Sequence, residues 1–204
     1  MSTSSESAEH ALRTAVELRR FSWIRPLVDA YANNFASVAP LFAGNPADQA
    51  SWRQTIARVQ RAPHDRGRLC SLLERQLETR GAPAQARTAA QQFADPAAVA
   101  IVTGQQAGLF GGPLYTLLKA VTAIQLARQV SSSYGAPAVP VFWVESEDHD
   151  WAEIRSAEVL DQELNVRTIT LADPAGAGTQ PAAALILDKS ITVALAMGGT
   201  ITTG

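Results

Sequence analysis

The sequence predicts an α/β fold in which a parallel strand–helix–strand unit follows a helical N-terminal region. In roughly the first ninety residues, apolar side chains recur mostly at three- and four-residue spacing, as on one face of a helix. The pattern changes at residue 98, where unbroken apolar runs at 98–102 and 139–144 flank a helical pattern over 113–130. Strand, helix and strand within about 45 residues are typical of a βαβ unit with parallel strands and a right-handed crossover.

The N-terminal region divides into successive helical segments. We expect helices over 8–20, from Pro26 toward Pro40, over 48–59, over 65–80 and over 83–93. Asp48 can cap the third of these. Gly81 suits the residue after the fourth, because glycine readily adopts the left-handed conformation found there.

The strand–helix–strand unit continues into a predicted hairpin. Pro113 suits the first position of the central helix, where its missing N–H costs nothing. The apolar stripe of that helix consists of Leu114, Leu117, Leu118, Val121 and Ile124. Two further strands, 156–160 and 166–171, flank a turn at 163–165, and a loop over 172–184 follows. We expect a helical region at 1–97, the first βαβ part of the core at 98–155, and the truncated start of an inserted or connective segment at 156–204.

Composition excludes several classes of protein. With 47% hydrophobic and 18% charged residues among 204, the chain is not intrinsically disordered. A net charge of -2 disfavours a general nucleic-acid binder. The single cysteine, Cys70, permits neither an intrachain disulfide nor a cysteine metal cluster. Residues 1–10 lack the apolar run of a secretory signal, and no stretch approaches the ~20 apolar residues of a membrane span, so we expect a cytoplasmic protein.

A glycine-rich segment follows the first predicted strand. Four of the chain's thirteen glycines lie at 104–112, and the same segment contains Gln105 and Gln106. The segment is neither a Walker A loop nor a GxGxxG fingerprint, so it is either a tight turn or a binding loop. Tyr115 and Lys119 share a face of the next helix, which is either a solvated edge or a place where Lys119 meets a phosphate or carboxylate.

An acidic segment follows the second predicted strand. Five of the nineteen acidic residues lie at 145–153, together with His149. Since the carboxyl ends of parallel strands meet at one edge of a sheet, the acidic and glycine-rich segments should converge on one crevice. The acidic side chains are either a solvated face or a site for acid–base chemistry or a divalent cation.

Long motifs in these segments resemble a known family. Residues 102–116 read VTGQQAGLFGGPLYT, residues 139–144 read VPVFWV, and residues 147–150 read EDHD. In order and spacing they resemble the bacillithiol biosynthesis cysteine-adding enzyme (BshC) family over about residues 20–171. The resemblance implies a Rossmann-like, nucleotidyltransferase-like core, here incomplete, and a ligase that joins cysteine to the amine of glucosaminyl malate. It also implies a homodimer formed through a C-terminal coiled coil that these 204 residues do not include.

The resemblance and the residues together define a candidate site. His149 is the acid–base candidate, oriented by Glu147, Asp148 or Asp150, and Lys119 is the candidate for electrostatic stabilisation. The residues expected to bind substrate or nucleotide are Gly104, Gln105, Gln106, Gly108, Gly111 and Tyr115. We assign no metal ligand, and we expect ATP or another nucleotide as activating cofactor. A metal-dependent hydrolase that uses the acidic segment and a nucleotide-binding module without catalysis remain the alternatives.

Overall fold

The computed structural model describes residues 16–187 and the backbone of 201–203. Within these residues it contains α1 (Pro26–Asn33), α2 (Gln49–Arg61), α3 (Arg66–Thr79), α4 (Ala84–Gln91), β1 (Val99–Gln106), α5 (Leu114–Tyr134), β2 (Ala138–Glu145), α6 (Trp151–Ile154), β3 (Ser156–Leu160), β4 (Val166–Thr170) and β5 (Ile201–Thr203). Residues 1–55 and 56–204 form two compact units, which are described separately. The expected domain limits at 97/98 and 155/156 stay predictions.

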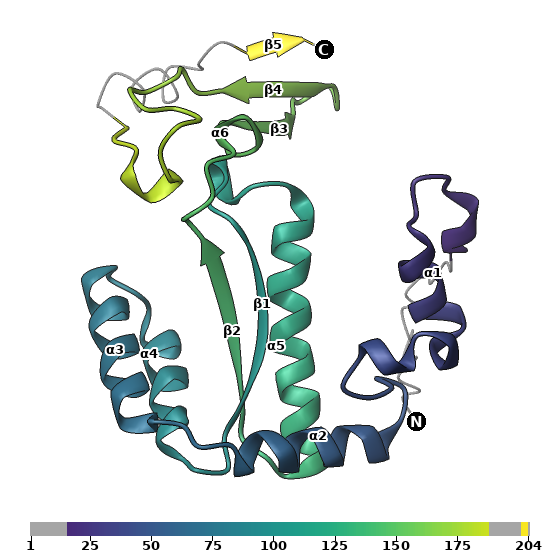
Figure 1. Cartoon of the computed structure of the whole chain (residues 1–204). Helices are drawn as coiled ribbons and strands as arrows, with labels where there is room; N and C mark the ends of the chain where they lie inside the picture. Colours follow the sequence, from purple (N-terminus) through teal and green to yellow (C-terminus); the bar gives the residue numbers. More distant parts are fainter. Residues whose placement is uncertain (1–15, 188–200, 204) are drawn as a thin grey trace, which may run out of the picture. The chain divides into compact units, whose positions relative to one another are not determined.

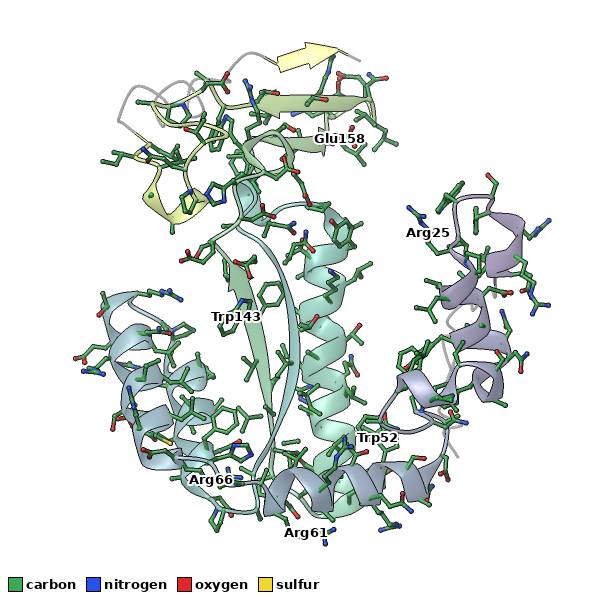
Figure 2. All side chains as sticks on the ribbon, in the orientation of Figure 1. Arg25, Trp52, Arg61, Arg66, Trp143 and Glu158 are labelled. Carbon is green, nitrogen blue, oxygen red and sulfur yellow. The ribbon has the colours of Figure 1, made fainter. Side chains whose placement is uncertain are left out.

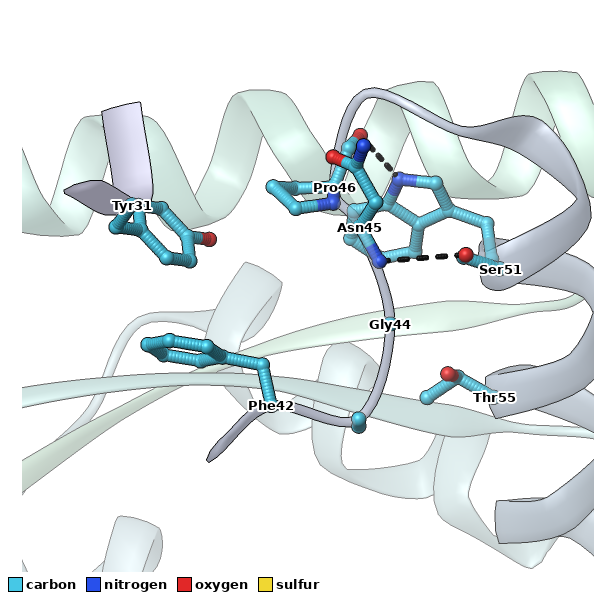
Figure 3. A pocket seen from close by; sticks show the side chains of 9 residues that line it. Tyr31, Phe42, Gly44, Asn45, Pro46, Ser51 and Thr55 are labelled. Atoms are coloured by element: carbon cyan, nitrogen blue, oxygen red, sulfur yellow. Dashed lines mark hydrogen bonds between the residues drawn. The ribbon is translucent and has the colours of Figure 1, made fainter. Parts of the chain in front are cut away.

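The first unit is built around aromatic side chains. The rings of Tyr31, Phe35 and Phe42 contact one another, with centroids 4.8–5.7 Å apart. A cavity of about 260 Å³ lies beside Tyr31 and Phe42 and reaches Thr55 on α2 (Figure 3). The predicted helix from Pro26 toward Pro40 ends at Asn33 and continues as 3₁₀ turns. Of the predicted helix over 8–20, residues 8–15 lie outside the described residues, and Leu18–Arg20 form only a 3₁₀ turn.

The predicted helix boundaries around α2 and α3 are confirmed. Asp48 accepts the backbone N–H groups of Ala50 and Ser51 at the start of α2. Asp65 accepts the N–H of Arg68 at the start of α3. Gly81, just after α3, has φ +61°, the left-handed conformation that ends a helix without a Cβ penalty.

The centre of the second unit is the predicted parallel βαβ unit. β1 and β2 pair in parallel from Val99 with Ala138 to Gln106 with Glu145. Figure 1 shows α5 on one side of these strands and the α3–α4 pair on the other. The core on the α3–α4 side contains Phe93, Ala98 and Val139, with Cys70 and Leu73 packed against it. Arg66, labelled in Figure 2, donates to the carbonyls of Phe93 and Ala98 and so ties α3 to the segment that enters β1.

Three expectations about the βαβ unit are wrong in detail. β1 does not end near residue 102 but runs to Gln106, because pairing with β2 continues through Gly104. Unbroken apolar runs are typical of strands buried on both faces, but Val102 and Trp143 are each 63% exposed. Pro113 is the N-cap of α5, one residue before the first helical position.

The apolar stripe predicted on α5 is largely exposed in the structure. Leu114, Leu117 and Leu118 are at least 57% exposed, and Val121 and Ile124 are exposed as well. The buried residues of α5 are Ala123, Ala127 and Val130. Small side chains allow the helix to lie close to the strands, whereas no described segment covers the larger ones.

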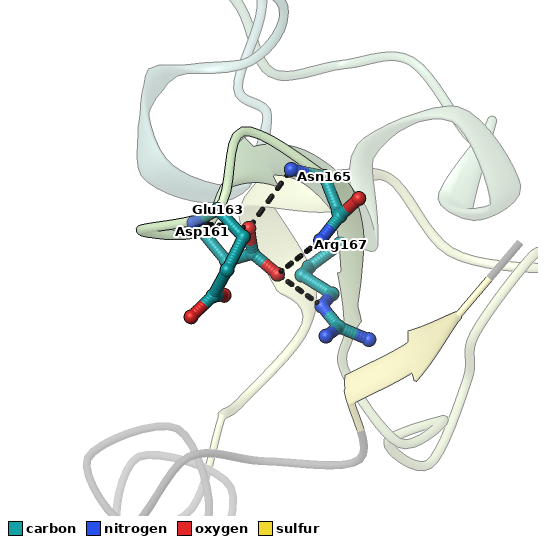
Figure 4. A network of polar contacts seen from close by, with 4 residues as sticks. All are labelled: Asp161, Glu163, Asn165 and Arg167. Carbon is teal, nitrogen blue, oxygen red and sulfur yellow. Dashed lines mark hydrogen bonds and ion pairs between the residues drawn. The ribbon is translucent and has the colours of Figure 1, made fainter.

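The predicted hairpin is confirmed as an antiparallel pair, β3 with β4, and β5 pairs antiparallel with β4. Asp161 organises its turn (Figure 4): the carboxylate accepts the backbone N–H groups of Glu163 and Asn165 and the Arg167 side chain. These hydrogen bonds from Asn165 and Arg167 hold the pKa of Asp161 below its ordinary value. No helix in the described residues is long and apolar enough to span a membrane.

Candidate functional site

The candidate site lies where β1 and β2 end. The last two residues of β1, Gln105 and Gln106, are half-buried at this edge. The chain then turns through Phe110, Gly111 and Gly112, all with positive φ, into α5. The turn therefore begins after the two glutamines. Their backbone belongs to β1, and the strand fixes where their side chains begin.

The first turns of α5 supply Tyr115 and Lys119. The Lys119 ammonium donates to the Gly104 carbonyl (3.3 Å) and to the Gln105 side-chain oxygen Oε1 (2.9 Å). It also lies 5.0 Å from the centre of the Tyr115 ring, a cation–π contact. The Tyr115 hydroxyl accepts from Gln105 Nε2 (3.2 Å). The shared helix face thus contacts β1 and is not merely a solvated edge.

The acidic segment reaches the same glutamines from the end of β2. Gln106 Nε2 donates to Asp148 Oδ2 (3.3 Å) and to Glu153 Oε2 (3.2 Å). Gln105 Nε2 also lies 3.5 Å from Glu153 Oε1. The predicted convergence of the glycine-rich and acidic segments is therefore present as direct side-chain contact.

A separate small core holds the acidic segment in place. Trp151 and Ile154 of α6 are buried against Leu171. The Trp151 indole N–H and the Arg155 guanidinium both contact Asp173 Oδ1, at 2.7 and 2.6 Å. Backbone N–H groups at 182 and 183 donate to the carbonyls of residues 148 and 146. These contacts hold α6 and the residues before it in place. They therefore fix the positions from which the Asp148 and Glu153 side chains contact the glutamines.

Asp148 is the acidic member of the predicted set that contacts the glutamines. Its carboxylate accepts the backbone N–H of Asp150 and the Gln106 amide. These bonds, with the nearby His149, hold the pKa of Asp148 below its ordinary value. Asp148 is therefore ionised at neutral pH and acts as a hydrogen-bond acceptor.

The other predicted acidic-segment residues lie at its rim. His149 is exposed, and its imidazole acts electrostatically on Asp148. Asp150 caps α6 by accepting the N–H of Glu153. Glu147 is exposed, and within the described chain its carboxylate makes no hydrogen bond. Of the three acids proposed to orient His149, Asp148 is the one on which the structure shows an electrostatic effect of His149. The acid–base role of His149 stays a prediction.

A glycine is required at each of the three predicted glycine positions, for a different structural reason at each. At Gly104 a Cβ would lie 2.5 Å from the Trp143 carbonyl oxygen, and at Gly108 one would lie 2.8 Å from the Gly112 Cα. Gly111 has φ +91°, which disfavours any L-residue. The glycines therefore permit the strand pairing and the turn. The Gly104 carbonyl accepts from Lys119, and the Gly108 N–H donates to the Gln106 carbonyl.

Glu153 is the functional candidate that the sequence assignment left out. Its carboxylate contacts both glutamines, although in the sequence it was only the last of five acids. The spacing of Asp150 and Glu153 is that of an N-cap residue and the third helical residue, and this pattern could have placed Glu153 in the first turn of a helix.

No group of three or more histidine, cysteine, aspartate or glutamate side chains in the described residues is arranged to hold a metal ion. A nucleotide fits one part of the site better than the other. The start of α5 and the Lys119 ammonium favour a phosphate, whereas the carboxylates of Asp148 and Glu153 repel one. Any phosphate would therefore be held by the α5 side of the site.

Parallel strands joined by a helix, with polar side chains gathered at their carboxyl ends, are the features of a Rossmann-like domain. The family model for the N-terminal Rossmann-like domain of bacillithiol biosynthesis BshC matches residues 14–198. The chain belongs to this family.

Curated relatives agree with this membership. The chain is 41% identical over 130 residues to a protein of Salinibacter ruber and 40% identical over 148 residues to one of Heliobacterium modesticaldum, both named "Putative cysteine ligase BshC". These alignments cover 64% and 69% of this chain but 24% and 27% of the relatives. The chain therefore spans about a quarter of the length of the curated relatives it matches.

Proposed function

We propose that this chain is the N-terminal domain of a ligase that adds L-cysteine to glucosaminyl malate, the last step of bacillithiol biosynthesis. The observation that carries the proposal is the family match over residues 14–198, together with relatives named as cysteine ligases. These names favour a ligase over a metal-dependent hydrolase and over a nucleotide-binding module without catalysis.

The reaction joins a carboxylate to an amine. It requires stabilisation of negative charge on the acyl oxygen and removal of a proton from the amine, and we assign Lys119 and His149 to these two tasks. A free carboxylate is a poor acyl donor, so we propose that ATP or another nucleotide would supply a phosphoryl or nucleotidyl group to the cysteine carboxylate. That group would leave with one carboxylate oxygen as the C–N bond forms. Lys119 has three N–H donors, of which two are used by Gly104 and Gln105. The remaining donor can stabilise negative charge on the acyl oxygen as the amine attacks.

His149 is the proposed proton acceptor. The attacking amine must lose a proton as the amide bond forms, and histidine is the side chain that most often accepts such a proton in enzymes. The exposed ring of His149 lies beside Asp148, whose carboxylate accepts from Gln106 in the same site. Gln105, Gln106 and Tyr115 would bind substrate polar groups, and Gly104, Gly108 and Gly111 would shape the backbone around them.

The cellular thiol profile tests the proposed function. Cells that lack the gene should contain no bacillithiol and should accumulate glucosaminyl malate, and an unchanged profile would overturn the proposal. Complementation with a His149→Ala variant should fail to restore bacillithiol. His64→Ala is the matched control, because His64 is an exposed histidine outside the site. Normal bacillithiol with His149→Ala would show that the acid–base role is wrong.

Other expectations of the family membership belong to the same proposal. We expect the protein to act in the cytoplasm on small molecules. The homodimer is expected to form through a coiled coil that lies outside these 204 residues.

A further inference from the structure

Glu153 is an acidic residue that the proposed reaction does not use directly. It lies in the four-residue helix α6, whose first turn is capped by Asp150 and whose buried face is Trp151 and Ile154. Its carboxylate faces both glutamines at the end of β1, with Oε1 3.5 Å from Gln105 Nε2 and Oε2 3.2 Å from Gln106 Nε2. Asp148, by comparison, contacts only one of the two glutamines, Gln106.

The two glutamine amides form a chain between opposite charges. Lys119 can only donate, so it faces the Gln105 oxygen, at 2.9 Å. Gln105 Nε2 then donates to Gln106 Oε1 at 2.6 Å, and Gln106 Nε2 faces the carboxylates. Ionised carboxylates can only accept, so the NH₂ end of each amide must point toward them. The amide dipoles therefore run in one direction, from Lys119 to Glu153.

From this arrangement we propose that Glu153 is a positioning residue, which orients Gln105 and Gln106 and thereby holds Lys119 against the end of β1. Its effect on catalysis rests on the proposed function, whereas its effect on the glutamines does not. Glu153 differs from Asp148 in contacting both amides at once, so it fixes their mutual orientation as well as that of Gln106.

A substitution that removes the charge of Glu153 but keeps the shape of its side chain separates the orienting role of Glu153 from a packing role. In Glu153→Gln the new amide can donate as well as accept, so it no longer dictates which end of Gln105 or Gln106 faces it. A reversed Gln105 would present its NH₂ group to Lys119, which is also a donor, and that contact would be lost. Glu153→Asp keeps the charge on a shorter side chain and should restore part of the orientation.

Side-chain NMR spectra of the ¹⁵N-labelled 204-residue chain test the positioning directly. In the wild type, the NH₂ signals of Gln105 and Gln106 should lie apart from those of solvated glutamines. Glu153→Gln should move both toward the solvated positions, and Glu153→Asp should move them less. Glu158→Gln is the matched control, because Glu158 is an exposed carboxylate on β3 away from the site (Figure 2). Unmoved Gln105 and Gln106 signals in a folded Glu153→Gln chain would overturn the proposal.

The kinetics of cysteine addition by the purified ligase test the consequence for Lys119. Glu153→Gln should lower kcat about tenfold and change KM less than about twofold, because Lys119 is proposed to act on charge that develops in the transition state. Glu153→Asp should recover part of kcat. Wild-type kcat in Glu153→Gln would overturn the link to Lys119. An inactive wild type would instead contradict the proposed function, and the NMR comparison would still decide the role of Glu153.

Discussion

Replacing Gly104 with alanine tests why a glycine stands where β1 approaches the site. Gly104 pairs with Trp143 of β2, and an added Cβ would lie 2.5 Å from the Trp143 carbonyl oxygen and 3.0 Å from its Cβ. Cβ atoms essentially never approach another atom closer than 3.0 Å. The strands must therefore separate by about 0.5 Å, and since backbone blocks the new methyl group we expect a cost of about 2–3 kcal/mol.

Thermal unfolding followed by circular dichroism measures this cost. For a chain of this length, the melting temperature should fall by about 4–12 °C. Gly67→Ala is the matched control, because in α3 its Cβ would have only Asp65 Oδ1 nearby, at 3.9 Å. Alanine is the better residue inside a helix, so that variant should be more stable by about 0.5–1 kcal/mol. A Gly104→Ala chain that melts at the wild-type temperature would refute the close approach of the strands.

Two further predictions concern the β3–β4 hairpin. The pKa of Asp161 is lower in the folded chain than in the unfolded chain. Asp161 therefore stabilises the fold above its unfolded pKa of about 4, and this stabilisation is lost as the pH falls through its folded pKa. Asp161→Asn should therefore lose less stability than the wild type between pH 7 and about pH 2 in urea unfolding, and parallel curves would contradict this. Leu164 has φ +64° and is 77% exposed, so Leu164→Asn should relieve strain and stabilise the chain by about 0.5–1 kcal/mol, whereas a lower melting temperature would show that the leucine is not strained.

Local patterns were sufficient to predict most of the elements. Asp48, Asp65 and Gly81 mark helix ends through interactions with the nearest few residues, which a sequence displays directly. The parallel pairing of β1 with β2 also followed, because two apolar runs joined by one helix have few ways to pack.

Features set by distant partners could not be predicted in the same way. Glycine and two glutamines are weak strand formers, so β1 seemed to end near residue 102, and only pairing with β2 extends it to Gln106. The spacing of the leucines predicted an apolar face on α5. It could not predict that this face is exposed in the described part of the chain. The expected order of the strands predicted that the acidic segment and the glutamines converge, but not that Glu153 contacts both amides.

We propose that the ends of β1 and β2, the start of α5 and the acidic segment form one binding site. Titration of glucosaminyl malate and of cysteine into the ¹⁵N-labelled chain tests it most directly. We predict that saturable shift changes centre on Gln105, Gln106, Lys119 and Asp148. Changes confined to the cavity beside Tyr31, or no change with either substrate, would contradict the claim.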